Sequence, residues 1–321
     1  MNSMPGRSAS DLDALARDLA EVTQVERDAP SAPLTTYRVG GPIALLVTVD
    51  GLDALLEVSA RLATYRGPVL VVGRGSNLLV VDGGFPGVAV RLGESFERVV
   101  VDATRTRTVA GGATPLPVLA RQSAALGCRG LEFFVGIPGT VGGAVRMNAG
   151  GHGSDTADVL VTATVLRLGD DASRVLDRGD LDFGFRRSAL TDADLVVSAE
   201  FETLAGDPDA ARAEIDDVVR WRRANQPGGQ NCGSVFVNPA GDSAGRIIEA
   251  CGLKGLRIGG AAVSDKHANF VQADPDATAA DIVAVIRAVQ VAVVEATGVR
   301  LRTELRIAPE GPPDPSDEMA P

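Results

Sequence analysis

Seven glycines fall within the twenty residues from Phe134 to Gly153, and this density restricts what the chain can fold into. Glycine loses more backbone entropy on folding than any other residue, so such a run is costly inside an ordered domain. Ile137, Val141 and Val145 alternate with the glycines, whereas a flexible Gly/Ser linker stays polar and solvated. The stretch therefore predicts either repeated turns with positive φ or a flat ligand lying close to the backbone.

A second glycine loop, VGRGSNLLV at 72–80, follows an apolar strand expected at 68–73. Consecutive backbone N–H groups in such a loop can hold the phosphates of a nucleotide. However, Leu78 stands in place of the third glycine of the dinucleotide fingerprint, and no Gly-Lys-Ser/Thr follows to make a Walker loop. Both standard nucleotide motifs are excluded, and an ordinary tight turn is an equal alternative on this loop alone.

The composition limits the class of protein. A chain of 321 residues with 45% hydrophobic residues can bury a core and favours two domains over one. The net charge of −11 argues against nucleic acid or an anionic membrane as a partner. Three cysteines without a Cys-x-x-Cys pair predict neither a disulfide framework nor a zinc site, so we expect no metal and a cytoplasmic location. No targeting or membrane segment is expected.

Hydrophobic periodicity predicts a mixed α+β chain. Leu12, Leu15, Leu19 and Val22 predict an N-terminal helix that we interpret as an appendage. Strands are expected at 43–49, 68–73, 86–92, 99–101, 105–110, 158–168 and 194–204, with helices at 52–63 and 115–126. The composition changes at 205–210, which predicts a domain boundary there.

The residues beyond this boundary predict a second α and β unit. We expect helices through Ile215 and around Ile247, a strand near 268–271, a long helix from 278 to 297 and a closing strand at 299–307. The proline-rich tail has almost no apolar residues and is expected to be disordered.

Cationic side chains are concentrated in the C-terminal half of the chain, from residue 183 onward, in an otherwise acidic protein, and could meet a substrate with several negative charges. They are Arg186, Arg187, Arg222, Arg223, Lys254, Arg257, Lys266 and His267. Solvated surface is the alternative for any one of them.

Seven sequence blocks occur in a consistent order between residues 31 and 307. They are TTYRVGGP (35–42), VGRGSNLLV (72–80), LEFFVGIPGTVGGAVRMNAG (131–150), FGFRRS (183–188), GSVFVNP (233–239), GLKGLRIGGAAVSDKHANF (252–270) and GVRLRTE (298–304). With these blocks the chain resembles the shorter form of the UDP-N-acetylenolpyruvoylglucosamine reductase family, flavoenzymes of bacterial cell-wall precursor synthesis.

The resemblance implies an α+β fold with a two-lobed FAD-binding domain of the vanillyl-alcohol-oxidase (PCMH) type and a C-terminal α+β substrate-binding domain. The implied organisation is a helical appendage at 1–30, the FAD-binding domain at 31–204, the substrate-binding domain at 205–308 and a disordered tail at 309–321. The lobes of the FAD-binding domain would cover about 31–95 and 96–204.

The resemblance also implies that the two glycine stretches hold FAD. The first would bind the pyrophosphate, and the second would follow the diphosphate and the isoalloxazine, with Thr140 as a hydroxyl partner of the flavin. The implied cofactor-binding residues are Gly73, Arg74, Gly75, Ser76, Asn77, Leu78, Gly136, Ile137, Gly139, Thr140, Gly142, Gly143, Asn148 and Ala149.

In the family, NADPH reduces the flavin, which then delivers hydride to the enolpyruvyl ether of UDP-N-acetylglucosamine and so gives UDP-N-acetylmuramate. By resemblance, Arg186 binds the substrate carboxylate and stabilises the enolate-like intermediate, and Ser234 is the proton donor. Arg187 is the competitor of Arg186, but the motif places the functional arginine directly after Phe185.

Glu304 has two interpretations. Alternation in 299–307 places it on the polar face of a strand with neighbouring arginines, which is typical of a solvated edge. The resemblance instead turns this face toward the flavin, where a carboxylate near Ser234 could tune or relay its proton.

The resemblance assigns substrate binding to Arg222, Asn238, Lys266 and His267. Many relatives have lysines where Asn225 and Val237 stand here, so other cations would have to contribute more to diphosphate binding. His152 stands where a tyrosine is common, and no role is assigned to it.

Two other functions stay open at this stage. One is another FAD-dependent oxidoreductase of the same fold that acts on a hydroxy acid or a sugar, because FAD loops do not determine a substrate. The other is a non-enzymatic UDP-sugar or flavin-binding protein, suggested by the missing lysines. If the chain has the function of the family, we expect a cytoplasmic enzyme with no nucleic acid partner and no insertion into membranes. A monomer is the favoured oligomeric state.

Overall fold

The computed structural model describes residues 9–102 and 106–309. The chain forms two compact units, both discontinuous in sequence. Unit 1 contains the described residues up to Ala29, then Ile43–Gly73 and Pro86–Val219, and unit 2 contains Pro30–Pro42, Arg74–Phe85 and the described residues from Arg220 onward. The contiguous domain boundaries expected from the sequence stay a prediction. The tail expected to be disordered lies outside the described residues from 310 onward.

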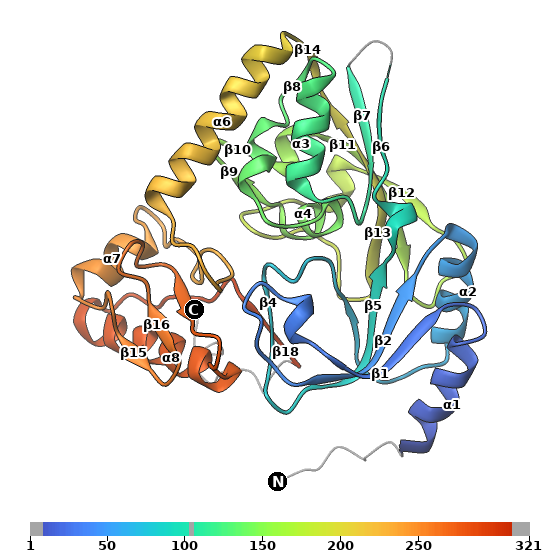
Figure 1. The fold of residues 1–321 in the computed structure, drawn as a ribbon, viewed down its shortest axis with the longest axis horizontal. Coiled ribbons are helices and arrows are strands. Elements are labelled where there is room, and N and C mark those ends of the chain that lie inside the picture. Colours follow the sequence, from blue (N-terminus) through green and yellow to red (C-terminus); the bar gives the residue numbers. More distant parts are fainter. Residues whose placement is uncertain (1–8, 103–105, 310–321) are drawn as a thin grey trace. The chain divides into compact units, whose positions relative to one another are not determined.

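Unit 1 contains two sheets (Figure 1). The first has the order β1-β2-β5-β3, from β1 (Gln24–Pro30), β2 (Pro42–Val49), β5 (Phe85–Leu92) and β3 (Val69–Val71), with β3 parallel to β5. Apolar side chains of this sheet share a core with α1 (Ala9–Leu19) and α2 (Leu52–Leu62). The predicted strand at 43–49 and helix at 52–63 are confirmed, whereas β1 was not predicted.

The second sheet is antiparallel throughout, in the order β12-β11-β13-β7-β6. Its strands are β6 (Val99–Val101), β7 (Arg107–Gly111), β11 (Leu160–Arg167), β12 (Arg174–Asp177) and β13 (Asp194–Glu202). The helices α3 (Leu116–Ala125) and α4 (Val141–Met147) and the 3-10 turn η3 (Glu132–Gly136) pack with it around Phe134 and Phe201, whose rings meet edge to face. Side chains of α6 (Pro208–Asn225) complete this core.

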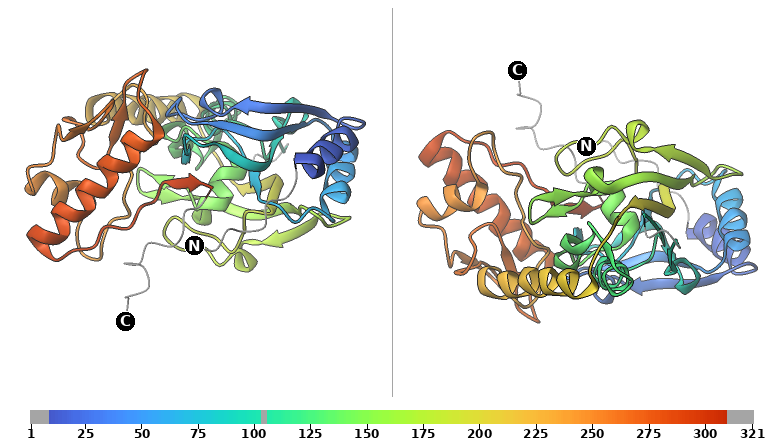
Figure 2. Two further views of the ribbon diagram at one scale, coloured as in Figure 1. Left: turned by 90° about the horizontal axis from the view of Figure 1, so that it is seen from below. Right: turned by 90° about the horizontal axis from the view of Figure 1, so that it is seen from above.

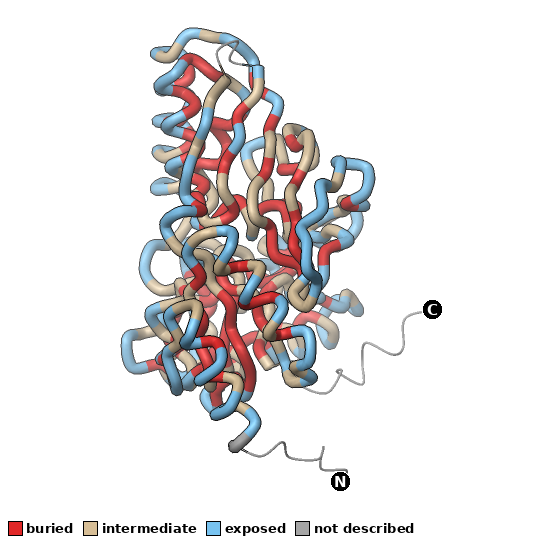
Figure 3. Tube along the Cα trace, turned by 90° about the vertical axis from the view of Figure 1, so that its right-hand side faces the viewer, coloured by how far each residue is buried: buried red, intermediate tan, exposed pale blue. Residues whose placement is uncertain are grey.

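Unit 2 is built around the long helix α8 (Ala279–Thr297), which packs on a sheet of β15 (Arg257–Ile258), β16 (Ala261–Val263) and β17 (Val271–Ala273) (Figure 2). The helix α7 (Ala244–Ala250) adds to the same core. Tyr37 and Leu79, from the two early segments of unit 2, are buried in it. The strand β4 (Leu78–Val80) pairs in parallel with β18 (Arg306–Ala308). Among the strands, β2, β4 and β5 are mostly buried, and Figure 3 shows the buried residues of the chain in red.

The remaining elements are short. They are β8 (Cys128–Arg129) with β14 (Leu204–Ala205), β9 (Gly150–Gly151) with β10 (Ser154–Asp155), α5 (Thr156–Val159), and the 3-10 turns η1 (Ala32–Leu34), η2 (Glu94–Phe96) and η4 (Arg178–Leu181). Of the helices described, none is long and apolar enough to cross a membrane.

The closing strand predicted at 299–307 is wrong over most of its length. Only Arg306–Ala308 is a strand, and Thr303 forms a single bridge with Phe236. Leu301 and Leu305 are buried as the alternation requires. The backbones of Arg302 and Glu304 hydrogen-bond to the segment 235–237, which is not a regular strand. Alternation in burial therefore does not produce a β-ladder here.

Candidate active site

The two glycine-rich stretches meet at Gly73 and Thr140. Gly73 follows β3 and is exposed, and a Cβ added to it would lie 2.6 Å from Thr140 Oγ1. Thr140 is buried and is the N-cap of α4, where its hydroxyl accepts a hydrogen bond from the Gly143 N–H at 3.3 Å. A side chain at position 73 would therefore displace the cap. Gly143 is also exposed, so glycine backbone free of side chains is accessible at this junction, as a closely approaching ligand requires.

Close approach of neighbouring atoms accounts for some glycines of the dense stretch, and turn geometry for one. Of its glycines, only Gly153 has a positive φ. A Cβ on Gly136 would meet Val218 and His152 at 3.2–3.3 Å, and one on Gly150 would meet Asp155 at 2.4 Å. The interpretation of repeated positive-φ turns is therefore wrong for most of the stretch.

Arg186 reaches back to this stretch from the tip of a tight hairpin. Gly184 and Arg187 exchange two backbone hydrogen bonds of 3.1 and 3.2 Å, and Arg186 has a φ of 55° in the loop between them. Its guanidinium donates to the carbonyl oxygen of Gly150 at 2.9 Å and to that of Asn148 at 3.4 Å. A half-buried cation is thereby held on the backbone of the predicted flavin-binding residues.

Arg187 has different surroundings. It is exposed, and its guanidinium donates to the carboxylate of Asp182 at 3.0 Å. The structure thus distinguishes the two arginines that the sequence left in competition. Arg186 donates to backbone carbonyls of the glycine-rich stretch, while Arg187 forms a surface ion pair with Asp182.

Asn148 is buried at the end of α4, with a left-handed φ of 42°. Its side-chain amide donates to Asp155 and to the Gly184 carbonyl, both at 3.1 Å, and accepts from the Ala157 N–H at 2.9 Å. Asn148 therefore ties the glycine-rich stretch to the hairpin that carries Arg186. The partner Asp155 was not predicted, because a single carboxylate after a glycine run carries no sequence signal.

In unit 2, Ser234 lies at the start of a segment that is held from two sides. The buried Asn269 bonds this segment through three contacts: its carbonyl accepts from the Val235 N–H at 2.8 Å, and its side-chain amide exchanges two hydrogen bonds of 2.9 Å with the Phe236 backbone. On the other side, the Val237 N–H donates to the Arg302 carbonyl at 2.9 Å. Asn269 lies within the sequence block at 252–270, but its role in holding the segment after Ser234 was not predicted.

The backbone of Glu304 is fixed beside the same segment. Its N–H donates to the Val235 carbonyl at 2.7 Å, and its carbonyl accepts from the side chain of Asn77 at 2.9 Å. Asn77 belongs to the first glycine loop, so this loop and the last block of the sequence are joined within unit 2. The Glu304 side chain is half-buried, which argues against the solvated-edge interpretation.

The rest of the first loop is constrained as well. Gly75 has a φ of 56°, and a Cβ there would lie 2.1 Å from the carbonyl oxygen of Leu34. Arg74 is exposed, Ser76 is half-buried, and Leu78 is buried as the first residue of β4. The loop therefore has a defined shape that only glycine permits at position 75.

The predicted substrate-binding residues of unit 2 lie on several elements. Arg222 is half-buried near the end of α6 and donates to Gln226 at 2.7 Å, and its burial lowers the pKa of the guanidinium. The Lys266 ammonium donates to the Arg223 carbonyl at 2.5 Å. Asn238 accepts from the Ala244 N–H at 3.0 Å, at the start of α7. This hydrogen bond supports the start of α7. The role of Asn238 in substrate binding stays a prediction.

His267 is held in one tautomer. Its Nδ1 accepts from the Asn269 N–H at 3.2 Å, which leaves the proton of the neutral ring on Nε2. Burial, assisted by the charge of Lys254, lowers the pKa of His267. Over the described part of the chain, no group of three or more His, Cys, Asp or Glu side chains could hold a metal ion.

Comparison with known proteins follows the same division of the site. Residues 43–171 match the FAD binding domain family, and residues 225–308 match the C-terminal domain family of UDP-N-acetylenolpyruvoylglucosamine reductase. Together with the two-sheet fold of unit 1 and its glycine-lined junction, the matches define an FAD-dependent oxidoreductase of the vanillyl-alcohol-oxidase (PCMH) type. This confirms the predicted α+β fold class and the predicted cofactor.

Individual relatives narrow the class to one family. The chain is 42% identical over 287 residues to UDP-N-acetylenolpyruvoylglucosamine reductase of Synechococcus sp. (strain WH7803), covering 88% of this chain and 92% of the relative. It is 43% identical over 281 residues to that of Rhodopseudomonas palustris (strain BisB5), covering 86% and 89%. The crystal structure of the reductase from Thermus caldophilus superposes with a TM-score of 0.77 at 36% identity, covering 89% and 100%. The chain belongs to the UDP-N-acetylenolpyruvoylglucosamine reductase family.

Proposed function

We propose that this enzyme reduces the enolpyruvyl ether of UDP-N-acetylglucosamine to UDP-N-acetylmuramate, with NADPH as the reductant. Family membership over most of the chain supports the substrate class. The observation that carries the proposal is the anchoring of Arg186 on the backbone of the glycine-rich stretch. A fixed guanidinium on the flavin-binding segment is what the developing carboxylate charge of this substrate requires.

FAD, when bound and reduced by NADPH, would supply the hydride that is added to the terminal carbon of the enolpyruvyl double bond. Arg186 binds the substrate carboxylate, because its planar fork matches two carboxylate oxygens at once. As charge develops on the neighbouring carbon and the carboxylate, the guanidinium stabilises the enolate-like intermediate.

Ser234 donates a proton to the carbon next to the carboxylate, which completes the reduction. A serine hydroxyl is a weak acid, so it depends on its orientation and on the groups near it. The half-buried Glu304, whose backbone is bonded to the segment that follows Ser234, tunes or relays this proton. Arg222, Asn238, Lys266 and His267 bind the UDP part of the substrate in this proposal.

We further propose that the enzyme acts in the cytoplasm as a monomer, without nucleic acid or membrane partners. The net charge of −11 supports the absence of nucleic acid and anionic membrane partners, because it disfavours association with polyanions.

The substitution Ser234→Ala tests the function by separating the two half-reactions. In stopped-flow absorbance, NADPH should reduce the flavin of the variant at the rate of the unmodified protein. Reoxidation by the enolpyruvyl substrate should slow by about 10²-fold, the usual loss for a positioned proton donor. Ser173→Ala, at an exposed serine, is the control and should reoxidise normally.

An equal reoxidation rate in Ser234→Ala and the unmodified protein would remove Ser234 from its role. Turnover with simple hydroxy acids and none with the enolpyruvyl UDP-sugar would overturn the proposed substrate.

A further inference from the structure

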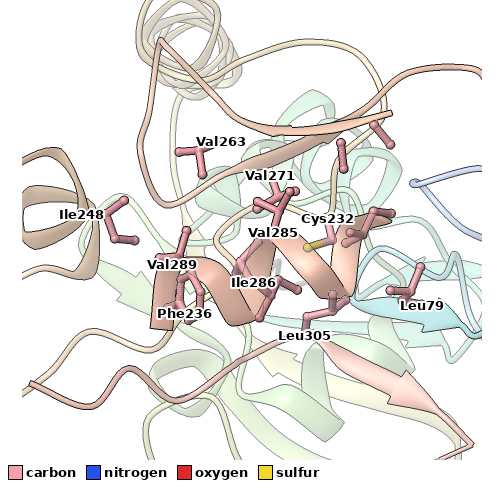
Figure 4. Close-up of a cluster of buried hydrophobic side chains, with 14 of the residues drawn as sticks. Leu79, Cys232, Phe236, Ile248, Val263, Val271, Val285, Ile286, Val289 and Leu305 are labelled. Atoms are coloured by element: carbon pink, nitrogen blue, oxygen red, sulfur yellow. The ribbon is translucent and has the colours of Figure 1, made fainter. Parts of the chain in front are cut away.

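Tyr37 and Cys232 form a buried pair in the core of unit 2. Cys232 lies two residues before Ser234, the proposed proton donor, along the chain. Tyr37 is fully buried, and Cys232 is 8% exposed. The sulfur of Cys232 lies in the cluster of apolar side chains that includes Val271, Val285 and Leu305 (Figure 4). Two polar groups in such surroundings need hydrogen-bond partners to offset the loss of water.

The hydrogen bond between the two side chains runs in one direction, from the thiol to the hydroxyl oxygen. The Cys232 thiol donates to the Tyr37 hydroxyl oxygen at 3.4 Å, and the Tyr37 hydroxyl donates to the Val271 carbonyl at 3.2 Å. The donors run from thiol to phenol to backbone, and the Gly233 carbonyl, 4.0 Å from the sulfur, is a more distant second acceptor for the thiol. It is therefore a satisfied polar network that crosses from an early segment of the sequence to a late one.

Both groups keep their protons. Burial raises the pKa of the Cys232 thiol to about 12, and the negative charge of Glu304 raises it as well. Burial and the neighbouring Cys232 raise the pKa of Tyr37 well above its ordinary value. No thiolate or phenolate forms next to Glu304 at physiological pH, so the network stays neutral and intact.

The position of the pair in the chain gives it a consequence for Ser234. Gly233, between Cys232 and Ser234, has a φ of 84°, and its N–H donates to the side chain of Asn231 at 3.0 Å. After Ser234, the chain is fixed by the hydrogen bonds of Asn269. Before Ser234, the buried Cys232 side chain packs in the core, and the Gln230 carbonyl accepts from the Ala273 N–H at 2.9 Å.

We propose that Cys232 and Tyr37 are positioning residues that hold the Gly233–Ser234 turn in the orientation needed for proton donation. The proposal rests on the proposed function, because it assigns its role through Ser234. The alternative is that Cys232 only fills space as a small apolar side chain, which is the common role of a buried free cysteine.

The half-reactions distinguish these roles in the FAD-loaded protein. Cys232→Ala removes the donor, and Tyr37→Phe removes the acceptor with little change in volume. Both should slow reoxidation of the reduced flavin by the enolpyruvyl substrate by about 10-fold or more, since small misplacements of a reacting group are costly. Flavin reduction by NADPH should stay unchanged, and Cys232→Ser, which keeps a donor, should restore most of the reoxidation rate.

Cys251→Ala is the matched control, because this half-buried cysteine of unit 2 packs against the same core without being placed at the turn. It should leave both half-reactions unchanged. Thermal unfolding of every variant, measured without substrate, separates a loss of stability from a loss of position.

Infrared absorption of the S–H stretch gives a readout that does not depend on activity. The chain has three cysteines, so the band lost in Cys232→Ala identifies the Cys232 thiol. In Tyr37→Phe this band should move to higher frequency, because the thiol loses its shorter hydrogen bond and keeps only the 4.0 Å contact with the Gly233 carbonyl. An unshifted band would contradict the hydrogen bond on which the proposal depends.

The outcomes separate this proposal from the proposed function. If Ser234→Ala slows reoxidation while Cys232→Ala and Tyr37→Phe do not, the pair only packs the core and the positioning role is overturned. If Cys232→Ser is as slow as Cys232→Ala, the loss does not come from the hydrogen bond, which also overturns it. If Ser234→Ala itself is normal, the failure belongs to the proposed function.

Discussion

Arg186 and Arg187 show how the function of a residue depends on its immediate contacts. The two side chains have the same chemistry and adjacent positions, yet one is bonded to the carbonyls of Asn148 and Gly150 and the other to the carboxylate of Asp182. A guanidinium that already pairs with a surface carboxylate is neutralised and screened by water, so it contributes little to a substrate. Arg186 donates to two backbone carbonyls of the glycine-rich stretch, which supports its assignment to the site.

The substitution Arg186→Lys tests this difference. Lysine keeps the charge but loses the planar fork, so it should not hold the carboxylate and the two carbonyls together. We expect reoxidation by the enolpyruvyl substrate to slow by about 10²-fold, with flavin reduction by NADPH unchanged. Arg187→Lys should behave like the unmodified protein in the same stopped-flow measurement, and equal rates for the two variants would contradict the assignment.

His267 predicts a pH dependence of stability. Its pKa is lowered in the folded state from the ordinary value of 6.5, mainly because of burial. The unfolded chain therefore binds this proton more readily, and the stability contributed by the neutral ring is lost as the pH falls below 6.5 toward the folded pKa. In urea unfolding, His267→Gln should lose less free energy of unfolding than the unmodified protein between pH ~7.5 and ~5. An identical pH dependence of the two proteins would contradict it.

At the scale of elements, the end of β3 and the start of α4 depend on each other. The helix begins with a cap by Thr140, and Gly73 leaves the space that the cap occupies. The same junction exposes the backbone expected to face the cofactor. A strand end, a helix start and a cofactor contact are therefore coupled through one missing Cβ.

The substitution Gly73→Ala should damage this junction. The new Cβ would lie 2.6 Å from Thr140 Oγ1. The short Thr140 side chain cannot move away without losing its hydrogen bond at the start of α4. Overpacking of this kind costs about 1–3 kcal/mol, so we expect the dissociation constant of FAD to rise by about 10-fold in fluorescence titrations of the apoprotein.

Gly151→Ala is the control for this experiment. Gly151 lies in the dense glycine stretch, but a Cβ there would meet nothing within 4 Å. It should bind FAD like the unmodified protein, and an equal loss of affinity in both variants would show that glycine content in general, and not the junction, is responsible.

At the scale of the whole molecule, the second unit is assembled from three separate segments of the chain. Its core contains Tyr37 and Leu79 besides residues of the C-terminal third, and β18 pairs with β4. A domain defined by the composition change at 205–210 would leave these contributions out.

A fragment of residues 205–308 should therefore not fold cooperatively on its own. Losing a large buried side chain costs about 2–5 kcal/mol, and the total stability of a domain is only about 5–15 kcal/mol. We expect no cooperative thermal transition in circular dichroism, in contrast to the full chain. A cooperative transition in the fragment would show that the early segments are dispensable for this core.

Much of the molecule follows from local sequence patterns. The strand at 43–49 and the helix at 52–63 were predicted because the first is an apolar, strand-like run and the second has apolar residues at helical spacing. The glycine stretches predicted either turns or a ligand held against the backbone, and the seven blocks predicted the family that the comparisons confirm. Each of these inferences depends on residues that are neighbours in the chain, or on their order along it.

Contacts between distant segments could not be predicted in this way. No local pattern joins Gly73 to Thr140, Asn77 to Glu304 or Tyr37 to Cys232, because each contact depends on how the chain returns to itself. The sequence by itself determined the family, most of the element types and the chemistry of the candidate residues. The tertiary structure decided which arginine reaches the glycine stretch and what holds Ser234, because a hydrogen bond or a close approach depends on distance in space and not on separation along the chain.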